Sequence, residues 1–172
     1  ITCNDEVAYA GELGIDVVVT DHHEPPEVLP EAVALVDPKR LDCPYPFKGL
    51  SGVGVAFKLA HAIARRSGLS EADAKDFLKS LFDLVALGTV ADVVPLLDEN
   101  RVLALFGLRV LEQTDKKGLQ ALTQLLGAGG RALTGETIAF QFGPRLNAAG
   151  RTGAAEDALE LLLTDDETRA WK

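Results

Sequence analysis

The segment with the sharpest chemical character is Asp21-His22-His23, which holds two of the three histidines in the 172-residue chain. It follows the β-branched run Ile15–Thr20 without a gap. A carboxylate and two imidazoles form a mixed oxygen and nitrogen donor set suited to Mn²⁺ or a similar divalent ion. Ligands gather at the carboxyl ends of strands in open α/β sheets, so these residues are predicted to lie at a site. The alternative is that Asp21 caps a turn and the histidines are surface loop residues.

A second candidate is Asp92, which stands alone in the apolar stretch Gly88–Pro95. A lone carboxylate among apolar residues is costly to bury as a charge unless something pairs with it. A metal ion would pair with it, and so would backbone amides at the start of the next segment. Both interpretations stay open from the residues alone.

A third candidate is the segment Gly143–Arg151, which contains Arg145, Asn147 and Arg151. Its glycines and proline predict a loop between helices. The planar fork of arginine matches the oxygens of a phosphate group, so the segment is predicted to hold phosphates. A capping loop with solvated arginines is the alternative.

The predicted secondary structure around these residues changes along the chain from mixed helix and strand to helix alone. A short helix, Glu6–Leu13, is predicted, with Asn4 or Asp5 as its cap and Gly14 at its end. The run Ile15–Thr20 is typical of a buried parallel strand. A second strand is predicted at Ala34–Val36, so the first third of the chain is expected to be α/β.

The remainder of the chain is predicted to be helical after the irregular, proline-containing segment Asp37–Lys48. Five helices are expected at Ser51–Arg66, Glu99–Gln113, Leu119–Leu126, Glu136–Phe142 and Ala154–Leu163. Another is expected to begin at a capping box, Ser70–Asp73, and to break at Gly88-Thr89. A last helix is expected to be capped by Thr164 or Asp165. The glycines of Gly52-Val53-Gly54 lack the Gly-Lys-Ser/Thr of a phosphate loop and indicate close helix packing. We expect two parts, residues 1–97 and 98–172.

Composition limits the class of protein. No apolar run approaches the roughly 20 residues that span a bilayer, and no signal peptide is visible at Ile1, so a cytoplasmic protein without membrane contact is expected. Cys3 and Cys43 are not expected to pair. The net charge of −9 argues against a broad cationic surface for nucleic acid but not against a local grip on one strand. The absence of Met suggests a piece of a longer chain.

Taken together and in this order, the segments resemble the DHH phosphoesterase superfamily, and within it the RecJ branch of single-stranded-DNA-specific exonucleases. The segments that carry the resemblance are Glu6–His23 for the third motif, Leu87–Leu96 for the fourth, Gly143–Arg151 for a further signature, and the connecting Asp37–Arg40, Cys43–Lys48 and Gly52–Lys58. The resemblance covers essentially the whole chain.

The resemblance implies part of a parallel-sheet DHH core followed by an all-helical segment. It implies a phosphodiesterase with two Mn²⁺ or Mg²⁺ ions that degrades single-stranded DNA from its 5′ end in repair and recombination. His22 and Asp92 would be metal ligands with Asp21 in the same cluster, and His23 would face the scissile phosphate. The residues implied to hold substrate phosphates are Arg145, Asn147 and Arg151. Single-stranded-DNA-binding protein and a helicase are implied partners.

The sequence departs from the family pattern at both ends. The first two metal-binding motifs would lie upstream, and the accessory domain would lie downstream. We therefore expect this chain alone to bind Mn²⁺ weakly and to have little or no nuclease activity. Two other functions stay open: a DHH-type phosphoesterase for short oligonucleotides, cyclic dinucleotides or pyrophosphate, and a non-catalytic binding module.

Overall fold

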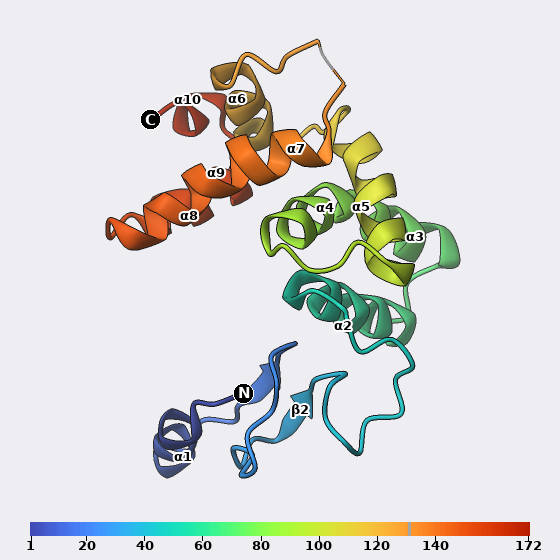
Figure 1. Cartoon of the computed structure of the whole chain (residues 1–172), viewed down its shortest axis with the longest axis vertical. Coiled ribbons are helices and arrows are strands. Elements are labelled where there is room, and N and C mark those ends of the chain that lie inside the picture. The colour runs from blue at the N-terminus through green and yellow to red at the C-terminus, as the bar shows by residue number, and fades with distance from the viewer. Residues whose placement is uncertain (131) are drawn as a thin grey trace.

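The computed structural model describes residues 1–130 and 132–172 of the chain. A small sheet with α1 lies at one end, α2 to α5 fill the middle, and α6 to α10 form the other end (Figure 1). The elements are α1 Asn4–Glu12, β1 Val18–Thr20, β2 Ala34–Val36, α2 Gly52–Arg66, α3 Glu71–Ser80, α4 Phe82–Ala91, α5 Asp98–Leu111, α6 Lys117–Leu125, α7 Gly135–Thr137, the π-helix η1 Ile138–Phe142, α8 Gly143–Arg151, α9 Ala155–Leu163 and α10 Glu167–Ala170. The predicted α/β part followed by a helical part is confirmed.

The sheet consists of β1 and β2, which run parallel and pair Val18 with Ala34 and Thr20 with Val36. The second strand lies where the sequence predicts it. The first is shorter than the predicted Ile15–Thr20, and it is not buried, because 55% of Val18 is exposed. In the described part of the chain the sheet has two strands, and 37% of Val36 in the second strand is exposed as well.

Helix α1 begins earlier than predicted. Asn4 and Asp5 lie inside the helix, and Cys3 occupies the N-cap position without a side-chain hydrogen bond. The prediction that Asn4 or Asp5 caps the helix is therefore wrong, and the Asn4 amide instead donates to the carbonyl of Val28. Gly14 follows the helix with a φ of +72°, as expected for a terminating glycine.

Helices α2 and α4 cross closely through small residues. Ser51 caps α2 by accepting a hydrogen bond from the Gly54 amide. The predicted break at Gly88-Thr89 is wrong, because α4 runs through both residues to Ala91. A Cβ atom on Gly88 would lie 2.8 Å from Cγ1 of Val53, so this glycine serves helix packing and does not end the helix. The glycines of α2 itself lie against other neighbours: a Cβ on Gly52 would lie 3.2 Å from His22, and one on Gly54 would lie 3.0 Å from Oγ of Ser51.

Two further boundaries in the helical part differ from the predictions. The segment Gly143–Arg151 is helix α8 instead of a loop. Pro144 lies in the first turn, where backbone amides have no partner within the helix, so the proline removes no helical hydrogen bond. The last helix, α10, is capped by Asp166, whose carboxylate accepts from two backbone amides, and not by Thr164 or Asp165. The capping role of Ser70 at the start of α3 is confirmed.

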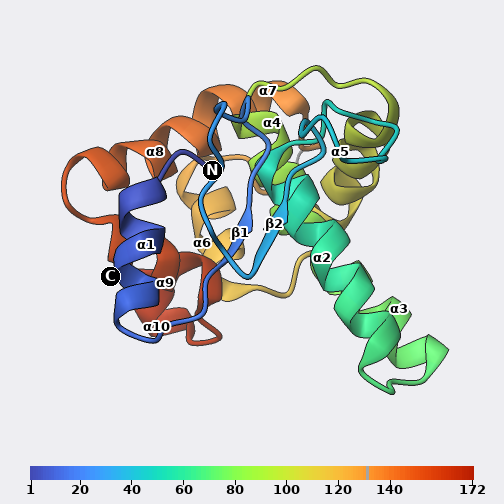
Figure 2. The same ribbon diagram turned by 90° about the horizontal axis from the view of Figure 1, so that it is seen from below.

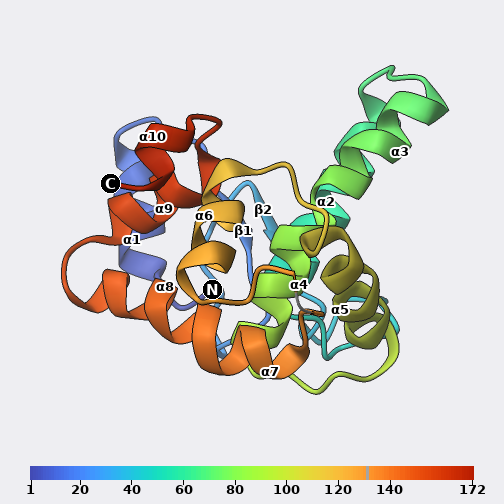
Figure 3. The ribbon, with the colours of Figure 1, turned by 90° about the horizontal axis from the view of Figure 1, so that it is seen from above.

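The hydrophobic core consists of two clusters that meet at α4. One cluster joins Ala86, Leu87 and Val90 of α4 to buried residues of α5, α6 and η1. The other joins Val85 of α4 to α2 and α5. Figures 2 and 3 show α4 in the interior with the other helices around it. Cys3 and Cys43 are both free. Within residues 1–130 and 132–172, no helix has both the length and the apolar character needed to cross a membrane.

Candidate metal centre

The centre is built at the carboxyl end of the two-stranded sheet. The Asp21 amide donates to the Val36 carbonyl at 3.0 Å, which extends the β1–β2 ladder by one bond. Asp21 Oδ1 accepts from the amides of His22 and His23 at 2.7 and 3.1 Å, so the chain turns tightly at this point. The backbone thus directs both histidines away from the sheet edge, and the turn-capping role of Asp21 is present in addition to any role in a metal site.

The Asp21 carboxylate is held in its charged form. Partial burial would raise its pKa, but hydrogen bonds from the Ile1 ammonium at 2.7 Å, the His23 ring and the two backbone amides outweigh that effect. Its pKa therefore lies well below the ordinary value for aspartate. Oδ1 of Asp21 accepts from both histidine amides and from the His23 ring, so this carboxylate orients the cluster, while Oδ2 lies beside the amino group of Ile1.

His22 and Asp92 meet from opposite sides of the centre. Nε2 of His22 lies 3.3 Å from Oδ2 of Asp92, which stands at the C-terminal cap of α4. Gly52 at the start of α2 permits this approach, because a Cβ there would lie 3.2 Å from Cδ2 of His22. Asp92 is only partly buried, since 38% of its side chain is exposed. The chain turns outward at Val93, which has a φ of +59°, so this carboxylate reaches the surface.

His23 is the most exposed residue of the cluster, with 73% of its side chain exposed. Its Nδ1 donates to Asp21 Oδ1 at 2.7 Å, which leaves Nε2 free for a ligand or a proton. The two histidine rings lie 4.5 Å apart between centroids and are tilted by 54°. Asp21 therefore orients His23 in the way that a carboxylate commonly orients a working imidazole.

The residues present fit a divalent metal ion. Ligand atoms of Asp21, His22 and His23 lie within 4.8 Å of one another, and Asp92 adds a carboxylate beside His22. An imidazole nitrogen and carboxylate oxygens with hydrogen-bonded partners are a donor set that Mn²⁺ accepts. His22 and Asp92 are the pair best placed to hold an ion, since neither is paired with Lys or Arg among the described residues.

The three polar residues of the predicted phosphate-binding segment do not act as one group. A Cβ on Gly143 would lie 3.1 Å from that of Ala91, so α8 starts close to Asp92. Asn147 and Arg151 are one helical turn apart and lie on the same face of α8. Arg145 points elsewhere: it donates to the Gln141 carbonyl at 2.8 Å and lines a hollow toward α9 and α10.

Sequence reasoning missed a buried network behind the centre. The hydroxyls of Ser51 and Thr89 lie 2.9 Å apart, and Asn100 Oδ1 accepts from the Ser51 amide at 3.2 Å. Asn100 also donates to the carbonyls of Gly49 and Pro95. These bonds fix the start of α2 against the end of α4 and so set the distance between His22 and Asp92. A polar Asn100 within the apolar stripe of α5 is the signal that could have revealed the network.

Comparison with known proteins gives a family match. The sequence model described as "DHH family, N-terminal domain" matches residues 1–89. The single-stranded-DNA-specific exonuclease RecJ of Bacillus subtilis (strain 168) is 48% identical over 165 residues, which cover 96% of this chain and 20% of that protein. The enzyme of the same name from Thermus thermophilus is 38% identical over 173 residues, which cover 99% of this chain and 24% of the relative.

Solved structures agree with these sequence matches. The crystal structure of RecJ from Thermus thermophilus in complex with Mn²⁺ superposes with a TM-score of 0.82 at 37% identity, covering 99% of this chain and 24% of that one. A crystal structure of exonuclease RecJ bound to manganese gives a TM-score of 0.83 at 39% identity, covering 99% of this chain and 41% of that chain. The chain thus spans between a fifth and a third of the length of the curated RecJ relatives that it matches.

Proposed function

This chain belongs to the DHH family, and on that premise we propose that it forms part of a metal-dependent exonuclease that hydrolyses single-stranded DNA from the 5′ end. The observation that carries the proposal is the approach of His22 to Asp92 at 3.3 Å, at a sheet edge where His23 keeps a free ring nitrogen. A binding module has no need of such a donor set. The relatives named as single-stranded-DNA-specific exonucleases support the choice of substrate.

We assign His22 and Asp92 as direct ligands of the metal, with Asp21 as the neighbouring carboxylate that anchors the cluster. Two Mn²⁺ or Mg²⁺ ions would lower the pKa of bound water and offset charge on the phosphate. His23 faces solvent beside them, where its Nε2 can donate to a phosphate oxygen or to a leaving oxygen. The Asp21 carboxylate accepts a hydrogen bond from Nδ1 of that ring at 2.7 Å and so fixes the ring's orientation.

Helix α8 is proposed to contact the single-stranded DNA. Asn147 and Arg151 share one exposed face and are proposed to contact substrate phosphates, with Arg151 as the bidentate partner. Arg145 is proposed to contact a phosphate from the adjoining face, after release from the Gln141 carbonyl. These local contacts are compatible with a net charge of −9, because they need no broad cationic surface.

The two parts of the chain have distinct proposed roles. Residues 1–97 form the C-terminal part of the catalytic α/β domain, and residues 98–172 form a helical extension of it. The setting is proposed to be cytoplasmic, in DNA repair and recombination. A helicase and single-stranded-DNA-binding protein are proposed partners, because an enzyme restricted to single strands depends on proteins that unwind duplexes and cover the product.

A chimera tests the proposal. The segment of full-length Bacillus subtilis RecJ that aligns with this chain is replaced by residues 1–172, and Mn²⁺-dependent release of nucleotides from 5′-phosphorylated single-stranded DNA is measured. We expect cleavage by the chimera and a loss of about 100-fold or more in rate with His22→Ala or Asp92→Ala, because each removes a metal ligand.

The matched control is His61→Ala, which removes the exposed histidine of α2 and should leave the rate unchanged. A folded chimera in which His22→Ala cleaves as fast as the parent would exclude the assigned site. Hydrolysis of dinucleotides or pyrophosphate in place of long strands would favour the small-substrate DHH phosphoesterases.

A further inference from the structure

A hollow of about 1050 Å³, which we term the α2–α3–α5 hollow, lies between these three helices. Figures 2 and 3 show α2 and α3 projecting from the body of the molecule, so one wall of the hollow belongs to this projection. Phe82 begins α4 and lines the hollow, whereas Asp92 caps the other end of the same helix. The two are about 15 Å apart along α4, so a molecule in the hollow would leave the metal centre open.

The surface inside the hollow is mainly aliphatic. Ala64 of α2, Ala74 and Leu78 of α3 and Val110 of α5 line it. Leu69, between α2 and α3, also lines it and is 49% exposed. A contiguous apolar surface of this kind on a protein marks a site of interaction. The two alanines leave room for another backbone to approach α2 and α3 closely.

Among the described residues, the aromatic rings of this lining offer little open face to a nucleobase. Phe57 and Phe82 pack on each other with ring centroids 5.0 Å apart and planes tilted by 51°, and only 9% of Phe57 is exposed. The Arg109 guanidinium lies over the Phe106 ring, 5.7 Å from its centroid. Single-stranded nucleic acids bind by stacking bases on open aromatic faces. The lining therefore favours aliphatic side chains of a protein over a nucleic acid.

The charged residues of the lining are mostly cationic, although the chain as a whole has a net charge of −9. Arg65, Lys75 and Lys79 line the hollow and form no ion pair among the described residues. Lys58 is a fourth cation, and Glu71 is the one carboxylate in the described lining. Unpaired cations beside an apolar surface complement an acidic partner.

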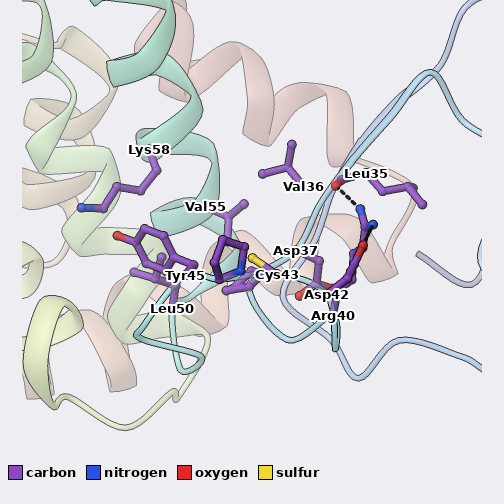
Figure 4. Close-up of a pocket in the computed structure, with 12 residues that line it drawn as sticks. Leu35, Val36, Asp37, Arg40, Asp42, Cys43, Tyr45, Leu50, Val55 and Lys58 are labelled. Atoms are coloured by element: carbon purple, nitrogen blue, oxygen red, sulfur yellow. Dashed lines mark hydrogen bonds and ion pairs between the residues drawn. The ribbon is translucent and has the colours of Figure 1, made fainter.

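A smaller hollow at the end of β2 lacks such free charge. Its volume is about 310 Å³, and Figure 4 shows the residues that line it. Arg40 in this lining is paired with Asp42 at 2.6 Å, and Lys58, which lines both hollows, is paired with Glu99 at 2.7 Å. Its cations are already paired, so the α2–α3–α5 hollow is the better match for an acidic ligand.

The lining positions recur at helical spacing. On α2 they include Phe57, His61, Ala64 and Arg65, at i, i+4, i+7 and i+8, and α3 contributes a similar stripe between Glu71 and Lys79. Each stripe runs for about 12 Å, which is the length of about two helical turns. A groove between two such stripes accepts the apolar face of a further helix, as the grooves of many peptide-binding proteins do.

We propose that the α2–α3–α5 hollow binds an acidic amphipathic helix of a partner protein. The apolar face of that helix lies against Ala64, Ala74 and Leu78, and its carboxylates meet Arg65 and Lys79 at the rim. The interaction tethers the protein to its partner and leaves the metal centre accessible. It does not depend on the proposed nuclease function, because neither the metal centre nor α8 takes part.

Fluorescence anisotropy of labelled peptides tests the proposal on the chimera with full-length Bacillus subtilis RecJ, without metal or DNA. The acidic probe is a helical peptide of roughly 15 residues with leucine at i, i+3, i+4 and i+7 and glutamate or alanine elsewhere. The basic probe carries lysine in place of every glutamate. We expect saturable binding of the acidic probe and about tenfold weaker binding, or none, of the basic probe.

Matched variants locate the binding surface. Arg65→Glu should weaken binding of the acidic probe about tenfold, because repulsion replaces attraction. Arg66→Glu makes the same charge change at the next residue of α2, outside the lining, and should alter the affinity by no more than about twofold. Phe106→Ala should also weaken binding, whereas Phe140→Ala, on exposed η1, should not. All four side chains are exposed, and circular dichroism checks that the variants are folded.

Equal affinities for the two probes, or equal losses with Arg65→Glu and Arg66→Glu, would overturn the proposal. Absence of binding to a folded chimera would also overturn it, because the remainder of the longer protein would then cover the hollow. A labelled thymidine oligonucleotide that loses affinity with Arg65→Glu but not with Arg66→Glu would assign the hollow to DNA instead. Self-association that Arg65→Glu abolishes in sedimentation velocity would assign it to a second copy of the chain.

Discussion

At the scale of single residues, Asp21 and Asp37 occupy matching places after two paired strands but differ in their hydrogen bonds. Both oxygens of Asp21 accept hydrogen bonds, whereas Asp37 has one satisfied oxygen and one without a partner among the described residues. In both residues the Oδ1 atom accepts from backbone amides just after the strand, those of His22 and His23 at Asp21 and that of Lys39 at Asp37. The same residue type therefore shapes the chain at two neighbouring points of one sheet edge.

Glu99 permits a prediction about pH. Burial would raise its pKa, but hydrogen bonds from Lys58 and Tyr45 outweigh that effect, so the pKa is lowered from 4.5. A lowered pKa means that the carboxylate stabilises the fold fully above pH 4.5 and loses this contribution as the pH falls through the folded value. Glu99→Gln should therefore reduce the free energy of unfolding at neutral pH, by about 0.5 kcal/mol since the pair is partly exposed.

Urea unfolding at neutral and acidic pH measures this effect. The difference between the parent and Glu99→Gln should shrink in acid, and the exposed loop variant Glu27→Gln provides the control. A difference that stays constant with pH would show that ionisation of Glu99 does not contribute.

At the scale of elements, glycines determine how closely the helices pack. A Cβ on Gly107 of α5 would lie 2.2 Å from the Phe82 carbonyl oxygen of α4. Gly107→Ala should therefore force the two helices apart and lower the free energy of unfolding by about 1–3 kcal/mol. Among the described residues, no atom lies within 4 Å of a Cβ added to Gly150 of α8, so Gly150→Ala should stabilise the helix by about 0.5–1 kcal/mol. Chemical denaturation of both variants makes the comparison, and equal effects would contradict it.

The same elements show where the sequence was sufficient. The cap at Ser70 is a local signal, and it is predicted correctly because a helix start depends on a few neighbouring residues. Gly88 was misread because its role depends on Val53, which lies 35 residues away in sequence and reaches it only after folding. Helix α8 was misread because glycine and proline are loop signals that a first helical turn also tolerates.

The candidate site likewise combines features that the local sequence predicts with features that depend on long-range contacts. Asp21, His22 and His23 were found because they adjoin a strand, and Asp92 was found because a carboxylate in an apolar stretch is unusual. Their ligand roles remain a prediction. The approach of His22 to Asp92 and the exposure of Asp92 depend on the positive φ of Val93 and on the buried contacts of Asn100. No local pattern encodes these long-range contacts, so the geometry of the site had to come from the fold.

At the scale of the whole molecule, the sheet end and the helical core differ in burial. Of the described residues, Ile1 and Val7 are the buried hydrophobics within residues 1–36, and neither belongs to the two core clusters. Helix α4 contributes to both clusters and is enclosed by other helices (Figure 3). The metal centre therefore connects a weakly packed part of the molecule, through His22, to its most buried helix, through Asp92.

This asymmetry predicts a pattern of amide hydrogen exchange. Amides of β1 should exchange faster than those of α4, since local opening of the sheet end exposes little apolar surface.

Mn²⁺ should slow exchange in residues 15–24, because an ion held by His22 and Asp92 stabilises the folded sheet end in proportion to its occupancy. Mass spectrometry of exchanged peptides measures both effects. Asp92→Asn should remove the response to Mn²⁺ while the exposed Asp76→Asn keeps it. A response that persists in Asp92→Asn would place the ion elsewhere, and uniform exchange would show that the sheet is as firmly held as the core.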